Sequence, residues 1–277
     1  MTVAGLGIDA GSTTTKLVAV DANGAIVAWR LEAADPRVEE QVTRLRREIA
    51  VETAWEADCP SVATGYGRKL ITSATRSVTE ISCHAQGVFA CFGREGTLVD
   101  IGGQDSKVIR IGADGRVVDF SMNDKCAAGT GRFLENTAAR LRLRLDEFAT
   151  RALATTDEEP ISSTCTVFAE SEIISLVARG ASLDAIVRGL HRSMLQRITS
   201  MIHTVGLTAP LMLSGGVARN QAVRALLEQT TGERVVVPEQ PQLMGAYGAA
   251  LLARGNGATA KNEPAAPPHV LAGRGRI

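Results

Sequence analysis

Residues 7–18 read GIDAGSTTTKLV, and residues 98–109 read LVDIGGQDSKVI. The two stretches align without a gap, from residue 7 onto residue 98, at an offset of 91 residues. Each contains an apolar strand, the pattern Asp-x-Gly, several small or polar residues, a lysine and a second strand with alternating apolar residues. This order predicts a β-hairpin whose turn is rich in backbone N–H groups and hydroxyls. Because the hairpin occurs twice in register, the sequence predicts two related domains that face each other across a cleft.

The rest of the chain alternates between strand and helix patterns. Strands are predicted near residues 4–9, 15–21, 25–32, 61–64, 97–101, 107–112, 116–121, 210–213 and 234–237. Helices are predicted near residues 37–53, 67–74, 80–91, 130–142, 145–152, 167–178, 182–206, 219–230 and 244–254. Helices alternate with strands after each hairpin, so the predicted fold class is α/β with mixed sheets.

The predicted domain borders follow the repeat. Domain I spans residues 1–95 and is completed by the helix near 244–254, whose small residues on one face suit a close contact with another helix. Domain II spans residues 96–243. The segment 255–277 is rich in Ala, Pro and Gly and is predicted to be a disordered tail.

Composition narrows the class of protein. The formal net charge is zero, which argues against nucleic acid as a partner. No apolar run reaches the ~18 residues that a membrane span needs, so no membrane association is expected. The first residues lead into a strand without a basic region or a cleavage site, and we therefore expect a cytoplasmic protein.

The two turns have the chemistry of a phosphate site. Phosphate oxygens need many short-range donors and little steric bulk, which glycine, serine and threonine provide, and a lysine adds positive charge. Two such turns are expected to hold the β- and γ-phosphates of a nucleotide from opposite sides. The candidate residues are Gly11, Ser12, Thr13, Thr14 and Lys16 in the first turn, and Gly102 and Gly103 in the second.

Acidic and amide side chains at these turns suggest hydrolysis. Asp9 ends its strand, where a carboxylate can hold Mg²⁺ through water, the usual manner for this ion. Gln104 or Asp105 is expected to orient the attacking water, because phosphoryl transfer depends mostly on positioning and charge stabilisation. The alternative, in which Asp9 and Asp100 only form turns at strand ends, stays open.

A third glycine turn, LSGGVARN at residues 213–220, follows a predicted strand and precedes a helix. Gly215 and Gly216 allow a ribose or a flat ring to approach the backbone, and the helix N-terminus favours phosphate. A simple connection from strand to helix, with no ligand, is the open alternative. His191 lies on a long predicted helix, where we expect a core or surface residue rather than a catalytic one.

The chain has five cysteines, at positions 59, 83, 91, 126 and 165, with no C-x₂-C spacing. The absence of closely spaced cysteine pairs argues against a zinc ribbon and a disulfide framework. Cys59, Cys83 and Cys91 are expected to be buried free thiols. Cys126 and Cys165 each follow cap-prone residues and precede a helix pattern, where a helix N-terminus stabilises a thiolate. Two cysteines cannot complete a Cys₄ iron–sulfur site, but a two-fold dimer supplies four. Buried free thiols remain the alternative for these two as well.

Taken together, these motifs resemble the ATP-dependent activators of 2-hydroxyacyl-CoA dehydratases, a BadF/BadG/BcrA/BcrD-type family of ATPases. That family is part of the acetate and sugar kinase, heat-shock protein 70 and actin superfamily. The resemblance covers roughly residues 4–254. The matching segments are GIDAGST (7–13), ATGYGR (63–68), EISCHA (80–85), DIGGQD (100–105), MNDKCAAGTGRF (122–133), residues 161–172 and GGVARN (215–220).

The resemblance implies two duplicated actin-like, ribonuclease H-like domains around a nucleotide cleft. It also implies a homodimer that shares one [4Fe–4S] cluster, bound by Cys126 and Cys165 of each subunit. Such proteins take electrons from ferredoxin or flavodoxin and pass them singly to a partner dehydratase, coupled to hydrolysis of ATP to ADP. Gly129, Gly131 and Asn220 fall within the matched motifs and are expected to contribute to nucleotide binding.

Other functions remain possible within the same resemblance. Related subunits of benzoyl-CoA reductases share this core, so the partner is not fixed by the match. A small-molecule kinase of the same superfamily is a second alternative, although a kinase gives no reason for Cys126 and Cys165. A nucleotide switch of the actin or chaperone type is the third.

Overall fold

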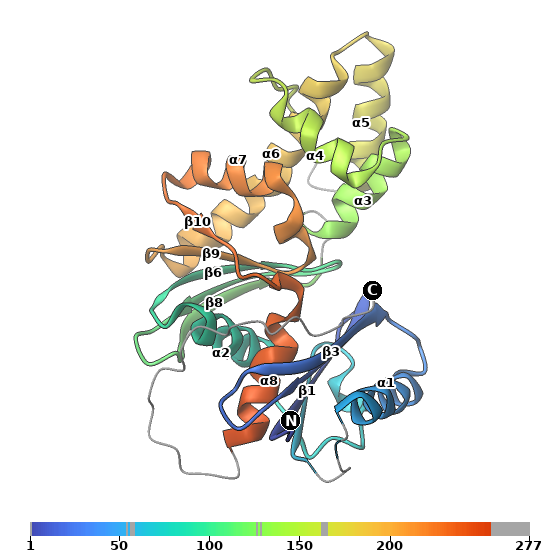
Figure 1. Cartoon of the computed structure of the whole chain (residues 1–277). Coiled ribbons are helices and arrows are strands. Elements are labelled where there is room, and N and C mark those ends of the chain that lie inside the picture. The colour runs from blue at the N-terminus through green and yellow to red at the C-terminus, as the bar shows by residue number, and fades with distance from the viewer. Residues whose placement is uncertain are drawn as a thin grey trace. The chain divides into compact units, whose positions relative to one another are not determined.

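The computed structural model describes residues 2–53, 55, 59–125, 127, 129–161 and 166–255. The chain divides into two compact units. Unit 1 comprises Met1–Glu95, Ile111–Val118 and Gln242–Ile277, and unit 2 comprises Gly96–Arg110 and Asp119–Pro241. Figure 1 shows a sheet and its helices in each unit. The predicted tail, from residue 256 onwards, lies outside the described residues, as do Cys126 and Cys165.

Unit 1 is built on a five-stranded sheet in the order β3-β2-β1-β4-β5. Its strands are β1 (Gly5–Ala10), β2 (Thr14–Val20), β3 (Ile26–Ala33), β4 (Ser61–Thr64) and β5 (Arg76–Ser77). Its helices are α1 (Val38–Thr53), α2 (Glu80–Phe92) and α8 (Met244–Arg254). Strand β1 pairs antiparallel with β2 and parallel with β4, so the sheet is mixed. The first pairing sets Asp9 directly opposite Lys16.

Helix α8 lies close to both β1 and α2 because its sequence offers almost no side-chain bulk there. A Cβ atom added at Gly248 would collide with the carbonyl oxygen of Cys83 in α2, and one added at Gly7 of β1 would collide with that of Ala246. The backbones therefore touch directly. The close contact predicted from the small residues of this helix is present between α2 and α8.

Replacing Gly248 with alanine is expected to lower the free energy of unfolding by about 3 kcal/mol. The obstacle is backbone, which cannot rotate away, so one of the two helices must move. Gly255 at the end of the same helix is the matched control, because it has φ −66° and no atom within 4 Å of an added Cβ. Urea unfolding followed by circular dichroism should leave Gly255→Ala within ~0.5 kcal/mol of the wild type. Equal midpoints for the two variants would contradict this account of the α2–α8 contact.

Unit 2 repeats the plan with a sheet in the order β10-β9-β6-β7-β8. Its strands are β6 (Gly96–Ile101), β7 (Ser106–Ile111), β8 (Val117–Asn123), β9 (Leu211–Ser214) and β10 (Val235–Val236). Its helices are α3 (Gly131–Arg140), α4 (Leu145–Leu153), α5 (Thr166–Ala178), α6 (Leu183–Val205) and α7 (Gln221–Thr231). Strand β9 runs parallel to both β6 and β10. Figure 1 shows α3, α4 and α5 grouped at one end of this unit.

The core of unit 2 is organised by α6. Its buried side chains recur at helical spacing, for example Ile186, Leu190 and Met194, and they pack in one apolar cluster with Phe133 and Phe148. This periodicity predicted the helix near 182–206, and the structure confirms it within a residue at each end.

The predicted α/β class is confirmed, but the helix expected near 67–74 is wrong. Only the short 3₁₀ turn η1 (Arg68–Leu70) forms there, and the two-residue strand β5 that follows was not predicted. Leu70 and Ile71 are adjacent rather than three or four residues apart, so they cannot share a helix face. Leu70 is accordingly exposed while Ile71 is buried.

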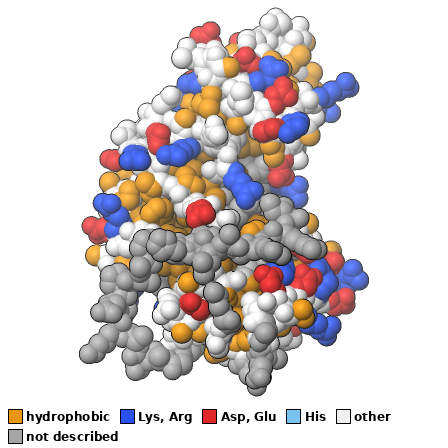
Figure 2. All heavy atoms as spheres, in the orientation of Figure 1, with side chains coloured by type: hydrophobic (Ala, Val, Ile, Leu, Met, Phe, Trp, Pro, Cys, Tyr) orange, Lys and Arg blue, Asp and Glu red, His pale blue; other side chains and the backbone are white. Residues whose placement is uncertain are grey.

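The surface carries charges of both signs. On the face drawn in Figure 2, basic and acidic side chains are interspersed, without a large region of one sign. This distribution agrees with the net charge of zero. Among the described helices, none is both long and apolar enough to cross a membrane.

Candidate functional site

The first predicted phosphate turn connects β1 to β2 in unit 1. The Gly11 N–H donates to the Thr14 carbonyl at 3.1 Å, which closes the turn. Ser12 is exposed, and Thr13 is half-buried. The Ala34 N–H donates to the Thr13 carbonyl at 3.0 Å, so the segment that follows β3 supports the turn from the side. The backbone at the tip is thus held in shape while the small residue at position 12 faces solvent.

Asp9 and Lys16 form an ion pair at the base of this turn. The Lys16 Nζ lies 3.1 Å from Asp9 Oδ2, and the two side chains are only 14% and 7% exposed. Gly65 has φ +86°, and a Cβ there would collide with Asp9 Oδ1. An added Cβ at Gly245 would lie 3.2 Å from Asp9 Oδ2. The carboxylate is therefore enclosed by one lysine and by backbone that only glycine can bring so close.

The residues around Asp9 fit a Mg²⁺ ion that is bound mainly through water and phosphate. No group of three or more His, Cys, Asp or Glu side chains in the described part of the chain could hold a metal ion by itself. Mg²⁺ does not require such a cage, since it commonly keeps several waters and takes one or two carboxylates together with substrate phosphates. A single enclosed carboxylate beside a turn rich in N–H groups agrees with that donor set.

The second predicted turn connects β6 to β7 in unit 2. Its Gly102 N–H donates to the Asp105 carbonyl at 2.9 Å, the same bond as in the first turn at the 91-residue offset. The N-terminus of α3 is bonded to this turn: Gly131 N–H donates to the Gly102 carbonyl and Arg132 N–H to the Gly103 carbonyl, each at 2.8 Å. The Gly131 N–H is thus used to hold the turn.

The ion pair of the first hairpin also recurs, but here it is fully buried. Lys107 Nζ lies 3.4 Å from Asp100 Oδ2 and 2.7 Å from Asp105 Oδ2, and the lysine side chain is 2% exposed. The Ser214 hydroxyl donates to Asp100 Oδ1 at 2.7 Å. The carboxylate of Asp105 is therefore engaged by Lys107, whereas Gln104 is exposed at the tip of the turn.

The third glycine turn is attached to the second. Gly215 follows β9 with φ +86°, and a Cβ there would collide with the Ile101 carbonyl at the end of β6. An added Cβ at Gly131 would lie 3.1 Å from the Gly102 carbonyl and 3.2 Å from Val217 Cγ2. The structure thus brings the predicted glycines of unit 2 to one edge of its sheet, where Gly216 is exposed. Gly129, also predicted to bind nucleotide, lies instead against the side chain of Arg197.

Asn220 has a local structural role. Its Oδ1 accepts from the N–H groups of Ala222 and Val223 and so caps α7. Its Nδ2 lies 3.0 Å from His191 Nε2, and His191 Nδ1 lies 2.8 Å from the Val187 carbonyl. Burial lowers the pKa of His191 to about 4, so the ring is neutral and donates through Nδ1 while Nε2 accepts from Asn220. His191 is a core residue, as predicted, but its contact with Asn220 was not foreseen.

The depressed pKa of His191 predicts a loss of stability in acid. Because the folded chain binds this proton more weakly than the unfolded chain, acid favours unfolding. The contribution of neutral His191 to the free energy of unfolding is fully present above pH 6.5 and is lost as the pH falls towards 4. It amounts to about 3 kcal/mol. Urea unfolding at pH 7.5 and 4.5 should show that His191→Leu removes this part of the pH dependence, whereas His203→Leu, exposed on the same helix, does not. If both variants showed the same pH dependence of unfolding, the assigned role of His191 would be wrong.

The cysteines divide into two groups. Cys59, Cys83 and Cys91 are free thiols, and burial raises the pKa of the first to about 11 and of the other two to about 12. They are protonated at neutral pH, which makes them poor metal ligands. Cys126 and Cys165 lie outside the described residues, but the helices predicted to follow them, α3 and α5, are present.

Comparisons with known proteins agree with this geometry. The family model described as the BadF/BadG/BcrA/BcrD ATPase family matches residues 6–253. The activator of lactoyl-CoA dehydratase from Anaerotignum propionicum is 42% identical over 249 residues, which cover 90% of this chain and 96% of that protein. The structure of the activator of the 2-hydroxyisocaproyl-CoA dehydratase from Clostridium difficile, with bound ADPNP, superposes with a TM-score of 0.82 at 37% identity. It covers 94% of this chain and 98% of its own.

A more distant likeness bears on the fold alone. A ROK family glucokinase from Streptomyces griseus has a TM-score of 0.56 at 14% identity, over 90% of this chain and 99% of that one. The predicted actin-like ATPase fold is confirmed by this set of structures.

Proposed function

The chain belongs to the BadF/BadG/BcrA/BcrD ATPase family, and we propose that it is an ATP-dependent activator of a 2-hydroxyacyl-CoA dehydratase. In this proposal it delivers single electrons to the dehydratase through a [4Fe–4S] cluster shared by two copies of the chain. The observation that carries the ATPase part is the duplicated turn with its Asp–Lys pair, Asp9 with Lys16 and Asp100 with Lys107. The 42% identity to a dehydratase activator supports the choice of partner.

ATP would be held by the phosphate turn of unit 1. Gly11, Ser12, Thr13 and Thr14 offer N–H groups and hydroxyls, and Lys16 offers a positive charge beside them. Asp9 would hold Mg²⁺ through water, and the bound ion would neutralise charge on the phosphates. Gly102 and Gly103 repeat these donors in unit 2. The exposed backbone at Gly216 suits the approach of the nucleoside.

The attacking water is best assigned to Gln104. Of the two candidates, Asp105 already receives Lys107 at 2.7 Å, so that carboxylate is committed to an ion pair. Gln104 is exposed at the tip of the same turn. A neutral amide can both accept from and donate to a water molecule, which is sufficient for orienting it.

The electron-transfer part rests on Cys126 and Cys165. Four thiolates, two from each copy of the chain, form the donor set of a [4Fe–4S] cluster, which supplies one-electron chemistry at low potential. Helix α3 begins at Gly131 and α5 at Thr166, shortly after each cysteine, and the helices are joined by the ion pair Arg140–Glu170 at 2.5 Å. A homodimer is required for this set, and ferredoxin or flavodoxin is the proposed electron donor.

Hydrogen bonds between the second turn and α3 support the proposed coupling between nucleotide and cluster. The Gly131 and Arg132 N–H groups bond the N-terminus of α3 to the Gly102–Gly103 turn. A change at the phosphates that moves this turn would therefore move α3, which starts next to the segment of Cys126. For a one-electron step, ~1.4 kcal/mol of such coupling corresponds to ~59 mV of potential.

The test is an anaerobic reconstitution. The purified chain, Mg-ATP and a one-electron reductant are mixed with a purified 2-hydroxyacyl-CoA dehydratase, and formation of the enoyl-CoA is followed together with iron per dimer. We expect dehydration only when both the chain and ATP are present. An iron-free chain that consumes ATP only with an added small-molecule acceptor would point to a kinase instead, and this result would end the proposal.

A further inference from the structure

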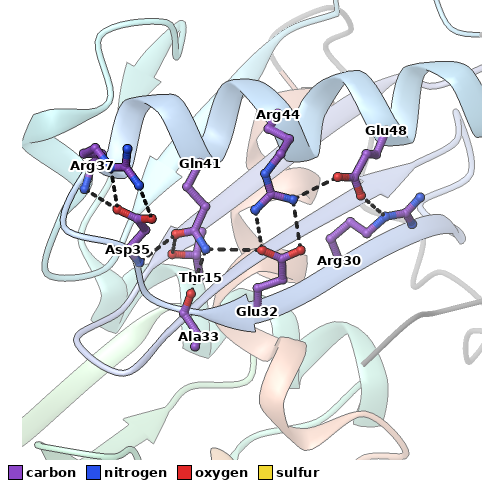
Figure 3. A network of polar contacts seen from close by, with 9 residues as sticks. All are labelled: Thr15, Arg30, Glu32, Ala33, Asp35, Arg37, Gln41, Arg44 and Glu48. Atoms are coloured by element: carbon purple, nitrogen blue, oxygen red, sulfur yellow. Dashed lines mark hydrogen bonds and ion pairs between the residues drawn. The ribbon is translucent and has the colours of Figure 1, made fainter.

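Gln41 lies behind the first phosphate turn and forms hydrogen bonds with residues of β2, of β3 and of the segment before α1. It comes from α1 and is 5% exposed. Its Oε1 accepts from the Thr15 hydroxyl at 2.8 Å and from the Asp35 N–H at 3.1 Å. Its Nε2 donates to the Ala33 carbonyl at 2.7 Å. Figure 3 shows this amide between β2, the end of β3 and the segment that leads into α1.

These bonds reach the turn itself through two short connections. Thr15 follows directly on the turn residues 11–14, and it is 1% exposed, so its hydroxyl depends on Gln41. In the β2–β3 pairing, Thr14 lies opposite Ala33, whose carbonyl receives Gln41. The next residue, Ala34, donates to the Thr13 carbonyl at 3.0 Å. Gln41 therefore fixes both strands at the place where the turn leaves the sheet.

Helix α1, which carries the Gln41 amide, is fixed in place by its buried apolar face. Its Val42, Leu45 and Ile49 are fully buried in the apolar core of unit 1. Arg44 pairs with Glu32 of β3 at 2.6 Å and with Glu48 at 2.9 Å, as Figure 3 shows. Arg44 is half exposed, so these pairs add little stability, and the buried apolar face is what holds the helix.

The second hairpin has no counterpart of the Thr15–Gln41 hydrogen bond among the described residues. Ser106 stands at the position of Thr15, 91 residues on, and is fully buried. Its hydroxyl has no hydrogen-bond partner within the described residues. That turn is held instead by the main-chain N–H groups of Gly131 and Arg132. The two turns share the same closing hydrogen bond but have different supports, and among the described contacts only the first turn is held by a side-chain amide.

We propose that Gln41 and Thr15 form a positioning pair that holds the turn of residues 11–14 in the shape that receives the nucleotide phosphates. This inference rests on the proposed ATPase function. Neither residue touches the phosphates, so both act through the backbone of the turn. Phosphate recognition by N–H groups depends on their direction, which a loosened turn would lose even if the fold remained.

The test compares variants that remove or keep the buried hydrogen bond. Thr15→Val has the same shape but no hydroxyl, Gln41→Met has nearly the same length but no amide, and Thr15→Ser keeps the hydroxyl, as the second hairpin does at Ser106. We expect Thr15→Val and Gln41→Met to weaken ADP binding in calorimetry about 10-fold, equivalent to ~1.4 kcal/mol. The KM for ATP should rise similarly while kcat changes less than about threefold. Thr15→Ser should stay within twofold of the wild type.

Two controls separate positioning from general destabilisation. Ser106→Ala removes the matching hydroxyl of the second hairpin, and Arg44→Ala removes the exposed ion pairs of α1. Both should bind ADP like the wild type. If Thr15→Val and Gln41→Met lower the melting temperature but bind ADP normally, the positioning pair is refuted while the ATPase remains. If one of the two does not fold, the other gives the same readout, and a ten-fold loss in Thr15→Ser would also contradict the proposal. Failure of the wild type to bind ADP would instead reject the proposed function.

Discussion

Replacing Asp9 with asparagine is expected to reduce Mg-dependent ATP hydrolysis about 1,000-fold. The carboxylate is 7% exposed and enclosed by Lys16 and by the backbone of Gly65, and the described residues hold no group of three or more His, Cys, Asp or Glu that could bind the metal ion instead. An amide of the same shape keeps the packing but is a much weaker partner for Mg²⁺. A 1,000-fold loss corresponds to ~4 kcal/mol of transition-state stabilisation, which is reasonable for a misplaced metal ion.

The measurement is steady-state phosphate release over a range of Mg²⁺ concentrations, together with iron content. Iron should be unchanged in Asp9→Asn, because the cysteines lie elsewhere in the chain. Asp100→Asn is the matched control from the second hairpin. There, Asp100 faces the 2%-exposed Lys107 and the hydroxyl of Ser214, so the main effect should be on folding.

For Asp100→Asn we expect a loss of about 3 kcal/mol in the free energy of unfolding, since a buried lysine loses part of its counter-charge. The fraction that remains folded should hydrolyse ATP much faster than Asp9→Asn. Unchanged turnover in Asp9→Asn would refute the role of Asp9 at Mg²⁺, whatever the behaviour of Asp100→Asn.

The features that could be predicted from the sequence are those with a short period. The apolar run of β1 and the alternation along β2 gave the hairpin, and the register set by its turn places Asp9 opposite Lys16. The spacing of apolar residues gave α6 almost to its ends. The duplicated Asp-x-Gly pattern predicted the second hairpin and the second domain, because a chance match would not also repeat the lysine.

The features that could not be predicted depend on contacts between distant segments. Thr15 reaches Gln41 across 26 residues, Asn220 reaches His191 across 29, and Ser214 reaches Asp100 across 114. Such bonds follow from strand order and helix packing, and no local sequence pattern predicts them. The same holds for the ion pair between Asp105 and Lys107, on which we base the choice of Gln104 over Asp105 in the proposal. The helix prediction for residues 67–74 was wrong for a different reason. Their polar composition is compatible with a helix, but their few apolar residues do not form one helix face.

Replacing Cys126 or Cys165 with serine is expected to abolish the iron–sulfur chromophore and with it all electron transfer to the dehydratase. In the proposed homodimer each substitution changes two of the four ligands, because the proposed cluster is shared between two identical chains. Serine is close in shape but binds iron weakly, so iron should fall from about four atoms per dimer to nearly none. ATP binding should persist, since the turns at Gly11 and Gly102 belong to other segments.

Cys91→Ser is the matched control for this experiment. Burial raises the pKa of Cys91 to about 12, so its thiol is protonated at neutral pH and is a poor ligand. Its removal should leave iron and electron transfer as in the wild type. An anaerobically purified Cys126→Ser protein that stays brown with full iron content would show that the ligands have been assigned wrongly. Loss of iron in all three variants would mean that the cluster responds to general destabilisation, and melting temperatures measured in parallel distinguish this outcome from loss of a ligand.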